Sequence, residues 1–292
     1  MATLANQADW YNTTNLMKKN TTQIMGILNV TPDSFSDGGK YDDIKSAIQH
    51  AEQMLHEGAD IIDIGGESTR PGSEAVDEKE ERSRVIPVIR ELKKKFPTST
   101  LSIDTKKALI AEEAVREGCT IINSLGGFSF DKGLARVAAK TKAQCIIYHI
   151  KGDPKTMQKG TITYDNVIDE ISGFFREQMA FGLSAGMKKD QFIIDPGIGF
   201  GKTLEQNITI IRHLHAFKKF HCPIAIGVSR KSHLGMLLKE QLQLDTLPSV
   251  EERLEASLAE TAIAIINGAT IIRTHDVLQT KKFVATLNAI IS

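Results

Sequence analysis

The stretch DIKSAIQHAEQMLHEGADIIDIGG, residues 43–66, contains one complete helix-to-strand unit. Its first part repeats apolar residues at helical spacing, and Gly58 is suited to end the helix. The stripe consists of Ile44, Ala47, Ile48, Ala51, Met54 and Leu55. The run that follows, DIIDIGG at residues 60–66, is short, apolar and β-branched, which is typical of a buried strand.

Runs of the same kind recur along the whole chain, with helical stretches between them. They are QIMGILNV (23–30), DIIDIGG (60–66), LSID (101–104), TIINS (120–124), QCIIYH (144–149), FIIDPG (192–197), IAIGVS (224–229) and TIIRTH (270–275). Strands that are apolar on both faces and alternate with helices indicate a parallel sheet covered by helices. Eight such units predict an α/β fold, a single-domain (β/α)8 TIM barrel, although an open doubly wound sheet has the same periodicity. We expect residues 1–20 to form an N-terminal extension and residues 21–292 to form the barrel.

Composition excludes several classes of function. The chain has 292 residues, with 36 Lys and Arg against 36 Asp and Glu, so no global charge attracts nucleic acid or an anionic membrane. No apolar run approaches the roughly 20 residues that span a bilayer. Cys119, Cys145 and Cys222 adjoin apolar runs without C-x-x-C spacing, which favours reduced core cysteines and a cytoplasmic protein.

Every predicted strand is followed by a side chain that can do chemistry. The groups are, in chain order, Asn29, residues 67–70, Asp104, Asn123, His149, Asp195, residues 229–231, Arg273 and His275. The carboxyl ends of barrel strands share one face, where active sites of this fold lie. Asn123 alone would also suit a helix cap or a turn. Capping does not require cations, however, and four of these groups together predict an anion site: Arg70, Lys231, Arg273 and His275.

The carboxylates Asp104 and Asp195 end two apolar strands, where burial is costly unless each accepts hydrogen bonds or pairs with a cation. A nitrogen heterocycle with adjacent N–H groups would satisfy both. The string PGIGFGKT (196–203) is similar to a Walker phosphate loop, but that motif needs glycine where this chain has Pro196. A nucleotide-binding loop is therefore not the favoured interpretation.

Several segments together resemble the dihydropteroate synthase family. They are MGILNVTPDSFSDGG (25–39), DIGGESTRPGS (63–73), SIDTKK (102–107), DPGIGFGKT (195–203), GVSRKS (227–232) and IIRTHDV (271–277). The resemblance runs from about residue 23 to the C-terminus. It implies a transferase that condenses 6-hydroxymethyl-7,8-dihydropterin pyrophosphate with p-aminobenzoate and releases pyrophosphate. It also implies Mg²⁺ as cofactor, a homodimer, small-molecule substrates as partners, and sensitivity to sulfonamides.

The resemblance also assigns roles by position. The pterin would be bound by Asp104, Asn123, Asp195 and Lys231. The pyrophosphate would be bound by Asn29, Arg70, Arg273 and His275, with Asn29 on Mg²⁺. The p-aminobenzoate site would be formed by Phe35, Thr69, Arg70, Pro71, Phe200 and Ser232. The catalytic set implied is Asp104, Lys231, Arg273 and His275.

Two positions depart from the family pattern. The family commonly has Asn-Asp where this chain has Asn123 and Ser124, and this implies the loss of a carboxylate near the pterin. It commonly has Met-His-Met where residues 148–150 are Tyr-His-Ile, which implies an altered pterin pocket. Two rival functions follow: a methyltetrahydrofolate methyltransferase, which would not need the pyrophosphate-binding cations, and a barrel that binds pterin without catalysis.

Overall fold

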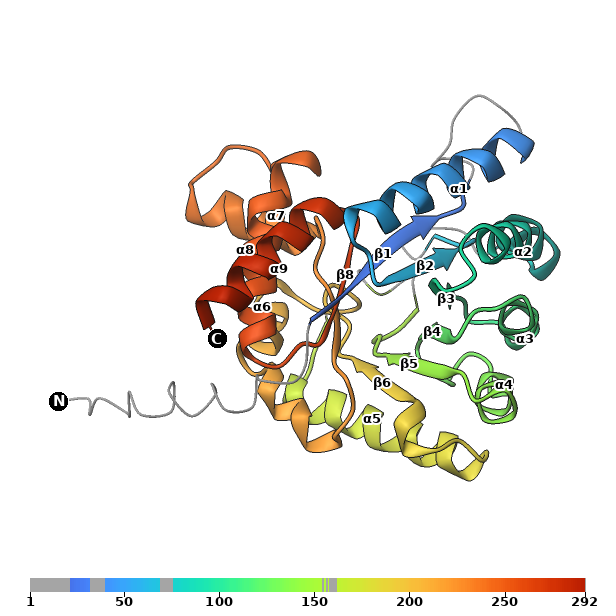
Figure 1. The fold of residues 1–292 in the computed structure, drawn as a ribbon. Helices are drawn as coiled ribbons and strands as arrows, with labels where there is room; N and C mark the ends of the chain where they lie inside the picture. Colours follow the sequence, from blue (N-terminus) through green and yellow to red (C-terminus); the bar gives the residue numbers. More distant parts are fainter. Residues whose placement is uncertain are drawn as a thin grey trace.

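The fold is given by a computed structural model that describes residues 22–31, 40–68, 76–153, 155, 157 and 162–291. The expected extension, residues 1–20, lies outside the described residues. Figure 1 shows strands at the centre of the molecule with helices arranged around them. Eight strands are present, and each coincides with one of the apolar runs. Their bounds are β1 Gln23–Asn29, β2 Ile61–Gly65, β3 Thr100–Asp104, β4 Ile121–Leu125, β5 Gln144–Tyr148, β6 Phe192–Asp195, β7 Ala225–Gly227 and β8 Ile271–Thr274.

The strands form one parallel sheet in the order β6-β5-β4-β3-β2-β1-β8-β7. Its two edges, β6 and β7, meet through a parallel bridge between Ile194 and Ile224, and Ile194 N donates to Pro223 O at 3.0 Å. These contacts curl the sheet into a nearly closed barrel. The (β/α)8 barrel expected from the sequence is therefore confirmed, and the open doubly wound sheet is excluded.

Helices follow the strands and cover the outside of the barrel. Their bounds are α1 Lys40–Glu57, α2 Glu78–Lys95, α3 Ala108–Arg116, α4 Gly133–Thr141, α5 Val167–Ser184, α6 Leu204–Arg212, α7 Ser232–Gln241, α8 Leu254–Ile266 and α9 Val277–Ile291. Helix α1 ends where the sequence predicts, because Gly58 has a φ of +99° and its N–H donates to Leu55 O. Cys119 and Cys145 are buried and Cys222 is half-buried, and all three are free thiols.

Alternation along the strands divides the barrel interior into layers. The lower layer is apolar and consists of Met25, Ile61, Ile121, Ile146, Ile193, Ala225 and Ile271, with Ser102 completing it on β3. Side chains two residues further along each strand point the same way. They form an upper layer of Ile27, Asp63, Asp104, Asn123, Tyr148, Asp195, Gly227 and Arg273. The interior thus changes from apolar to polar at the carboxyl ends of the strands.

Candidate active site at the carboxyl ends of the strands

The polar upper layer, defined by the eight residues above, is organised around Arg273. Its Nε donates to Asp63 Oδ2 at 2.7 Å, and its Nη2 donates to Asp104 Oδ2 at 2.8 Å. The two carboxylates come from β2 and β3, whereas Arg273 lies on β8. Burial raises the pKa of Asp104 to about 7, with Arg273 opposing this shift and the nearby Asp63 charge adding to it. Asp104 can therefore change its charge near neutral pH.

Asp63 also binds the side chain of Asn123. Asn123 Nδ2 donates to Asp63 Oδ2 at 2.9 Å, and both side chains are buried. The sequence pattern predicted Asn123 as a site residue but not Asp63. The signal that could have found it was a charged residue inside the apolar run DIIDIGG, since a fully buried polar group is the informative exception in a strand.

Asp195 of the upper layer and Lys231, which follows β7, lie on the opposite side of the barrel mouth. Asp195 Oδ1 accepts a hydrogen bond from Gly197 N at 2.8 Å, and burial raises the pKa of this carboxyl to about 6. Lys231 Nζ donates to Ile198 O and lies 4.6 Å from the centre of the Phe200 ring. Burial lowers the pKa of Lys231 to about 8, against the attraction of Asp195. Both predicted residues thus lie at the mouth.

The loop between β6 and α6 does not act as a phosphate loop in this fold. Its amide at Gly197 faces Asp195, and a Cβ added to Gly197 would lie 1.8 Å from His149 O. Lys202, which sequence reasoning also missed as a buried residue, lies 2.9 Å from His149 Nδ1 and donates to Phe200 O at 3.0 Å. Only 3% of Lys202 is exposed and burial holds its pKa well below the usual value, so its side-chain nitrogen is engaged within this loop and is not available to a nucleotide.

Tyr148 and Phe200 form an aromatic wall beside the polar layer. Their ring centres are 4.7 Å apart in an edge-on arrangement, and the pairing of β5 with β6 places Tyr148 beside Asp195. Burial raises the pKa of Tyr148 well above its usual value, so the phenol stays neutral. This family departure therefore does face the site.

The other departure, at Ser124, does not face the site. Ser124 follows Asn123 on β4 and so points out of the barrel, where its Oγ donates to Gly127 O at 2.6 Å. The loss of a carboxylate at position 124, expected to lie near the pterin, therefore concerns the outer face of β4, because adjacent residues of a strand lie on opposite faces.

The segments after β7 and β8 are tied together at the rim. Ser229 Oγ lies 3.1 Å from His275 Nδ1, and Arg230 binds both oxygens of Asp276, at 2.9 and 2.7 Å. His275 is exposed, as is Ser232 in the first turn of α7. The structure thus brings Lys231, Arg273 and His275 to one end of the barrel, as expected. Four other predicted site residues lie outside the described residues: Phe35, Thr69, Arg70 and Pro71.

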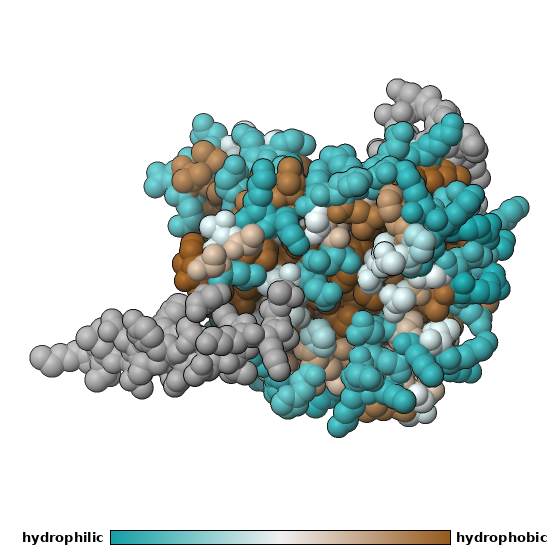
Figure 2. All heavy atoms as spheres, viewed as in Figure 1, coloured by the Kyte–Doolittle hydropathy of each residue, from teal (hydrophilic) through white to brown (hydrophobic). Residues whose placement is uncertain are grey.

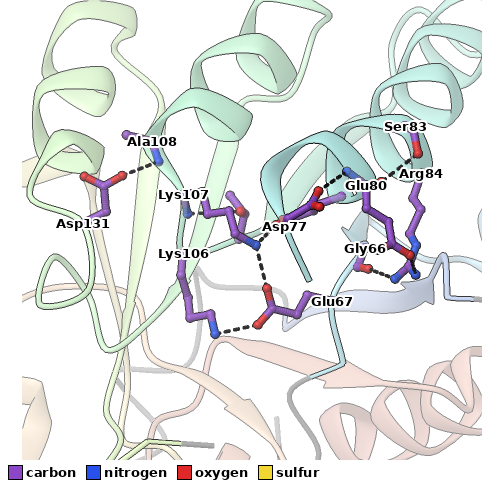
Figure 3. Close-up of polar contacts among 12 residues, drawn as sticks. Gly66, Glu67, Asp77, Glu80, Ser83, Arg84, Lys106, Lys107, Ala108 and Asp131 are labelled. Atoms are coloured by element: carbon purple, nitrogen blue, oxygen red, sulfur yellow. Dashed lines mark hydrogen bonds and ion pairs between the residues drawn. The ribbon is translucent and has the colours of Figure 1, made fainter. Parts of the chain in front are cut away.

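A charged cluster lies beside the site, where the chain leaves β2 (Figure 3). Glu67 accepts from Lys106 and from Lys107, both at 2.7 Å, and Lys107 also donates to Glu81 of α2. Arg84 of α2 donates to Gly66 O at 2.7 Å. Lys107 therefore links Glu67, which precedes residues 69–75 in the sequence, to Glu81, which follows them.

Asn29 is the candidate for metal binding. Within the described ranges, no three His, Cys, Asp or Glu side chains gather as a metal site. Mg²⁺ commonly uses only one or two protein oxygens and completes its shell with water and substrate phosphates. The half-buried Asn29 amide lies at the end of β1, beside Gly65 of β2. If Gly65 were replaced by alanine, the new Cβ would lie 3.9 Å from Asn29 Oδ1. This donor fits an ion held mainly by a phosphorylated substrate.

Comparison with known proteins agrees with this geometry. The pterin-binding enzyme family matches residues 25–275. Dihydropteroate synthase of Clostridium beijerinckii is 45% identical over 262 residues, which are 89% of this chain and 91% of that protein. The Escherichia coli K12 enzyme is 43% identical over 269 residues, 92% of each chain.

A crystal structure of the Yersinia pestis dihydropteroate synthase with a sulfonamide drug complex superposes with a TM-score of 0.84 at 41% identity, covering 92% of this chain and 94% of that one. The Xanthomonas albilineans enzyme in complex with 7,8-dihydropteroate gives a TM-score of 0.80 at 33% identity, covering 92% and 93%. The chain belongs to the dihydropteroate synthase family of pterin-binding enzymes.

Proposed function

We propose that the protein condenses 6-hydroxymethyl-7,8-dihydropterin pyrophosphate with p-aminobenzoate, giving 7,8-dihydropteroate and pyrophosphate. The observation that carries this proposal is the polar upper layer, in which buried carboxylates and cations meet at the carboxyl ends of the strands. Relatives support the substrates, since the Xanthomonas albilineans enzyme has been solved with 4-aminobenzoic acid and with 7,8-dihydropteroate.

The pterin is assigned to the upper layer. Asp104 and Asp195 are buried acceptors, which suit the N–H groups of a pterin, and Lys231 supplies a donor for its carbonyl oxygen or ring nitrogen. Asn123 is fixed beside Asp104 by the pairing of β3 with β4. In this assignment the ligand's N–H groups replace the water that two buried carboxylates would otherwise need.

The leaving pyrophosphate is assigned to the rim. Arg273 and His275 supply positive charge from β8 and the segment after it, and Arg70 is expected to add to it. Arg273 uses Nε and Nη2 for the two carboxylates, so a phosphate would meet the remaining side of its guanidinium group. Asn29 would hold Mg²⁺, which when bound supplies positive charge to the departing pyrophosphate.

The chemistry requires charge stabilisation more than proton transfer. The C–O bond to pyrophosphate breaks, and its electron pair leaves with the pyrophosphate, whose charge the cations at the rim neutralise. The positive charge that develops on the pterin methylene is stabilised by the ionised carboxylate of Asp104. The nitrogen of p-aminobenzoate then attacks this carbon and passes one proton to the released pyrophosphate, because the protonated arylamine is acidic enough to need no stronger base.

The p-aminobenzoate is assigned to the outer part of the mouth. Ser232 lies in the first turn of α7, a helix of ten residues whose N-terminal amides favour the ligand's carboxylate. Phe200 supplies an apolar surface for the aromatic ring, and Phe35, Thr69, Arg70 and Pro71 are assigned to the same pocket by resemblance. Exclusion of water from this pocket would protect the carbocation, which water could otherwise capture.

We further propose that the protein acts in the cytoplasm as a homodimer. The unpaired thiols accord with a reducing compartment. Over the described residues, no helix is long and apolar enough to cross a membrane. Exposed apolar side chains that could meet a second copy occur on α7, on α8 and between them, in the upper left of Figure 2. They are Met236, Leu242, Leu244, Leu247, Val250 and Ile263.

One assay separates this function from its rivals. The purified protein is given both substrates with Mg²⁺, and pyrophosphate and dihydropteroate are measured. We expect equal amounts of both products, formed only when p-aminobenzoate and the pterin substrate are present together. A methyltransferase or an inert pterin-binding barrel would release no pyrophosphate, and that result would refute the proposal.

A further inference from the structure

Asp63 is a fully buried carboxylate at the centre of the upper layer, and no role has yet been given to it. Its relative exposure is 0%, and its Oδ2 accepts two hydrogen bonds, from Arg273 Nε at 2.7 Å and from Asn123 Nδ2 at 2.9 Å. It thus joins β8 to β4 across the barrel. These two partners are the residues assigned above to the pyrophosphate and to the pterin.

The carboxylate fixes the orientation of the Asn123 amide. An ionised carboxylate can only accept hydrogen bonds, so Asn123 must turn its NH₂ group toward Asp63 and its oxygen away. Asn123 Oδ1 is buried and has no hydrogen-bond partner among the described residues. An asparagine or a serine in place of Asp63 could donate as well as accept, and the Asn123 amide would then be free to rotate.

The same carboxylate fixes Arg273 and sets the charge around Asp104. Among the described residues, the charges that act on Asp104 include Arg273 from β8, Asp63 from β2, Glu81 from α2 and Lys106 from the segment after β3, and the titratable phenol of Tyr148 on β5 interacts with it as well. Of these, Arg273 lowers the pKa of Asp104 most, and Asp63 raises it. A neutral residue at position 63 would remove the opposing charge and leave Arg273 neutralised by Asp104 alone.

We propose that Asp63 is a positioning residue for this reaction, which orients the Asn123 amide toward the pterin, fixes the Arg273 guanidinium for the leaving group, and places a second negative charge beside Asp104. The proposal rests on the proposed function. It differs from a purely structural role because it predicts which substrate and which pH range respond to a change at position 63.

The test is Asp63→Asn, which keeps the size of the side chain and removes its charge. We expect kcat/KM for the pterin pyrophosphate to fall by about 100-fold, the effect typical of a misplaced catalytic group. The KM for p-aminobenzoate should stay within about twofold, since Phe200 and Ser232, the assigned residues that the structure describes, follow β6 and β7, whereas Asp63 lies on β2. Ser102→Ala is the matched control. Ser102 is also buried in the interior and lies opposite Asp63 in the pairing of β3 with β2, and its Oγ has no hydrogen-bond partner among the described residues. It should leave both constants unchanged.

The pH profile is the second readout. In the wild type, kcat/KM for the pterin substrate should fall as pH drops below about 7, because Asp104 takes up a proton. In Asp63→Asn this acid limb should move to lower pH, because a like charge has been removed beside Asp104. Ionisation of the substrate itself affects both proteins equally, so the difference reports the enzyme. An acid limb that stays in place would overturn the electrostatic part of the proposal.

Binding of 6-hydroxymethylpterin, measured by calorimetry, separates this proposal from the proposed function. Loss of affinity in Asp63→Asn, with wild-type affinity in Ser102→Ala, supports the role of Asp63 even in a protein that releases no pyrophosphate. Wild-type pterin affinity in Asp63→Asn would overturn it. If Asp63→Asn melts far below the wild type, Asp63→Ser provides a second variant. An equal decline of kcat/KM for the pterin substrate and for p-aminobenzoate in both variants would show that Asp63 only maintains the fold.

Discussion

In the charged cluster of Figure 3, Lys107 balances the buried carboxylate of Glu81, so loss of its charge should destabilise the protein. The perturbation is Lys107→Met, which keeps the aliphatic stem and removes the ammonium group. Lys107 is the cation bonded to Glu81, whose side chain is only 1% exposed and whose other oxygen, Oε1, has no hydrogen-bond partner within the described residues. The variant therefore leaves a buried carboxylate uncompensated.

The expected cost follows from that burial. Removing one partner of a buried ion pair typically destabilises a protein by about 3–5 kcal/mol. Glu67 adds little to this figure, because it retains Lys106 at 2.7 Å. For a domain of this size, 1 kcal/mol corresponds to roughly 2–4 °C in Tm, so Lys107→Met should melt roughly 10 °C below the wild type.

The assay is thermal unfolding followed by circular dichroism, with two comparison variants. Lys106→Met should cost less than about 1 kcal/mol, because Glu67 then keeps Lys107 and is not left unpaired. The double variant Lys107→Met with Glu81→Gln should recover most of the loss, since the uncompensated charge is gone. A Tm of Lys107→Met within about 2 °C of the wild type, or a double variant no more stable than the single one, would refute the reasoning.

Three further predictions concern the active site. Lys231→Ala should abolish most turnover with little change in Tm, and near wild-type turnover in this variant would show that Lys231 is not a catalytic residue. In the wild type, kcat/KM for the pterin substrate should fall as pH rises above about 8, because Lys231 loses its proton there. Tyr148→Phe should raise the KM for the pterin substrate about 2- to 10-fold, the equivalent of one hydrogen bond of about 0.5–1.5 kcal/mol, and an unchanged KM would mean that the hydroxyl group does not meet the pterin. Pro71→Leu should raise the inhibition constant of a sulfonamide more than the KM for p-aminobenzoate, because the drug's extra ring would extend past this residue; equal changes in the two constants would contradict that placement.

The local patterns of the sequence predicted the alternation of eight strands with helices and most of the strand-end groups, whereas closure into a barrel was one of two architectures with that pattern. Each strand is a local run of β-branched residues and each helix a local apolar stripe, so the element order follows from short-range patterns that need no tertiary information. The positions of Asp104, Asn123, Asp195 and Arg273 followed from the same patterns, because a polar residue at the end of a parallel strand has only one end of the barrel to occupy.

The contacts among these groups were decided only by the tertiary structure. Asp63 and Arg273 are 210 residues apart, and they meet because β1 pairs with both β2 and β8, so that these two strands lie on the same side of the barrel. Lys202 became a buried partner of His149 only when the glycine-rich loop folded over β5 and β6. Ser124 turned out to face away from the site, because the inward direction of a strand is set by its register, and a shift of one residue exchanges the two faces. Register and closure are properties of all the strands together, which is why no single segment of the sequence encodes them.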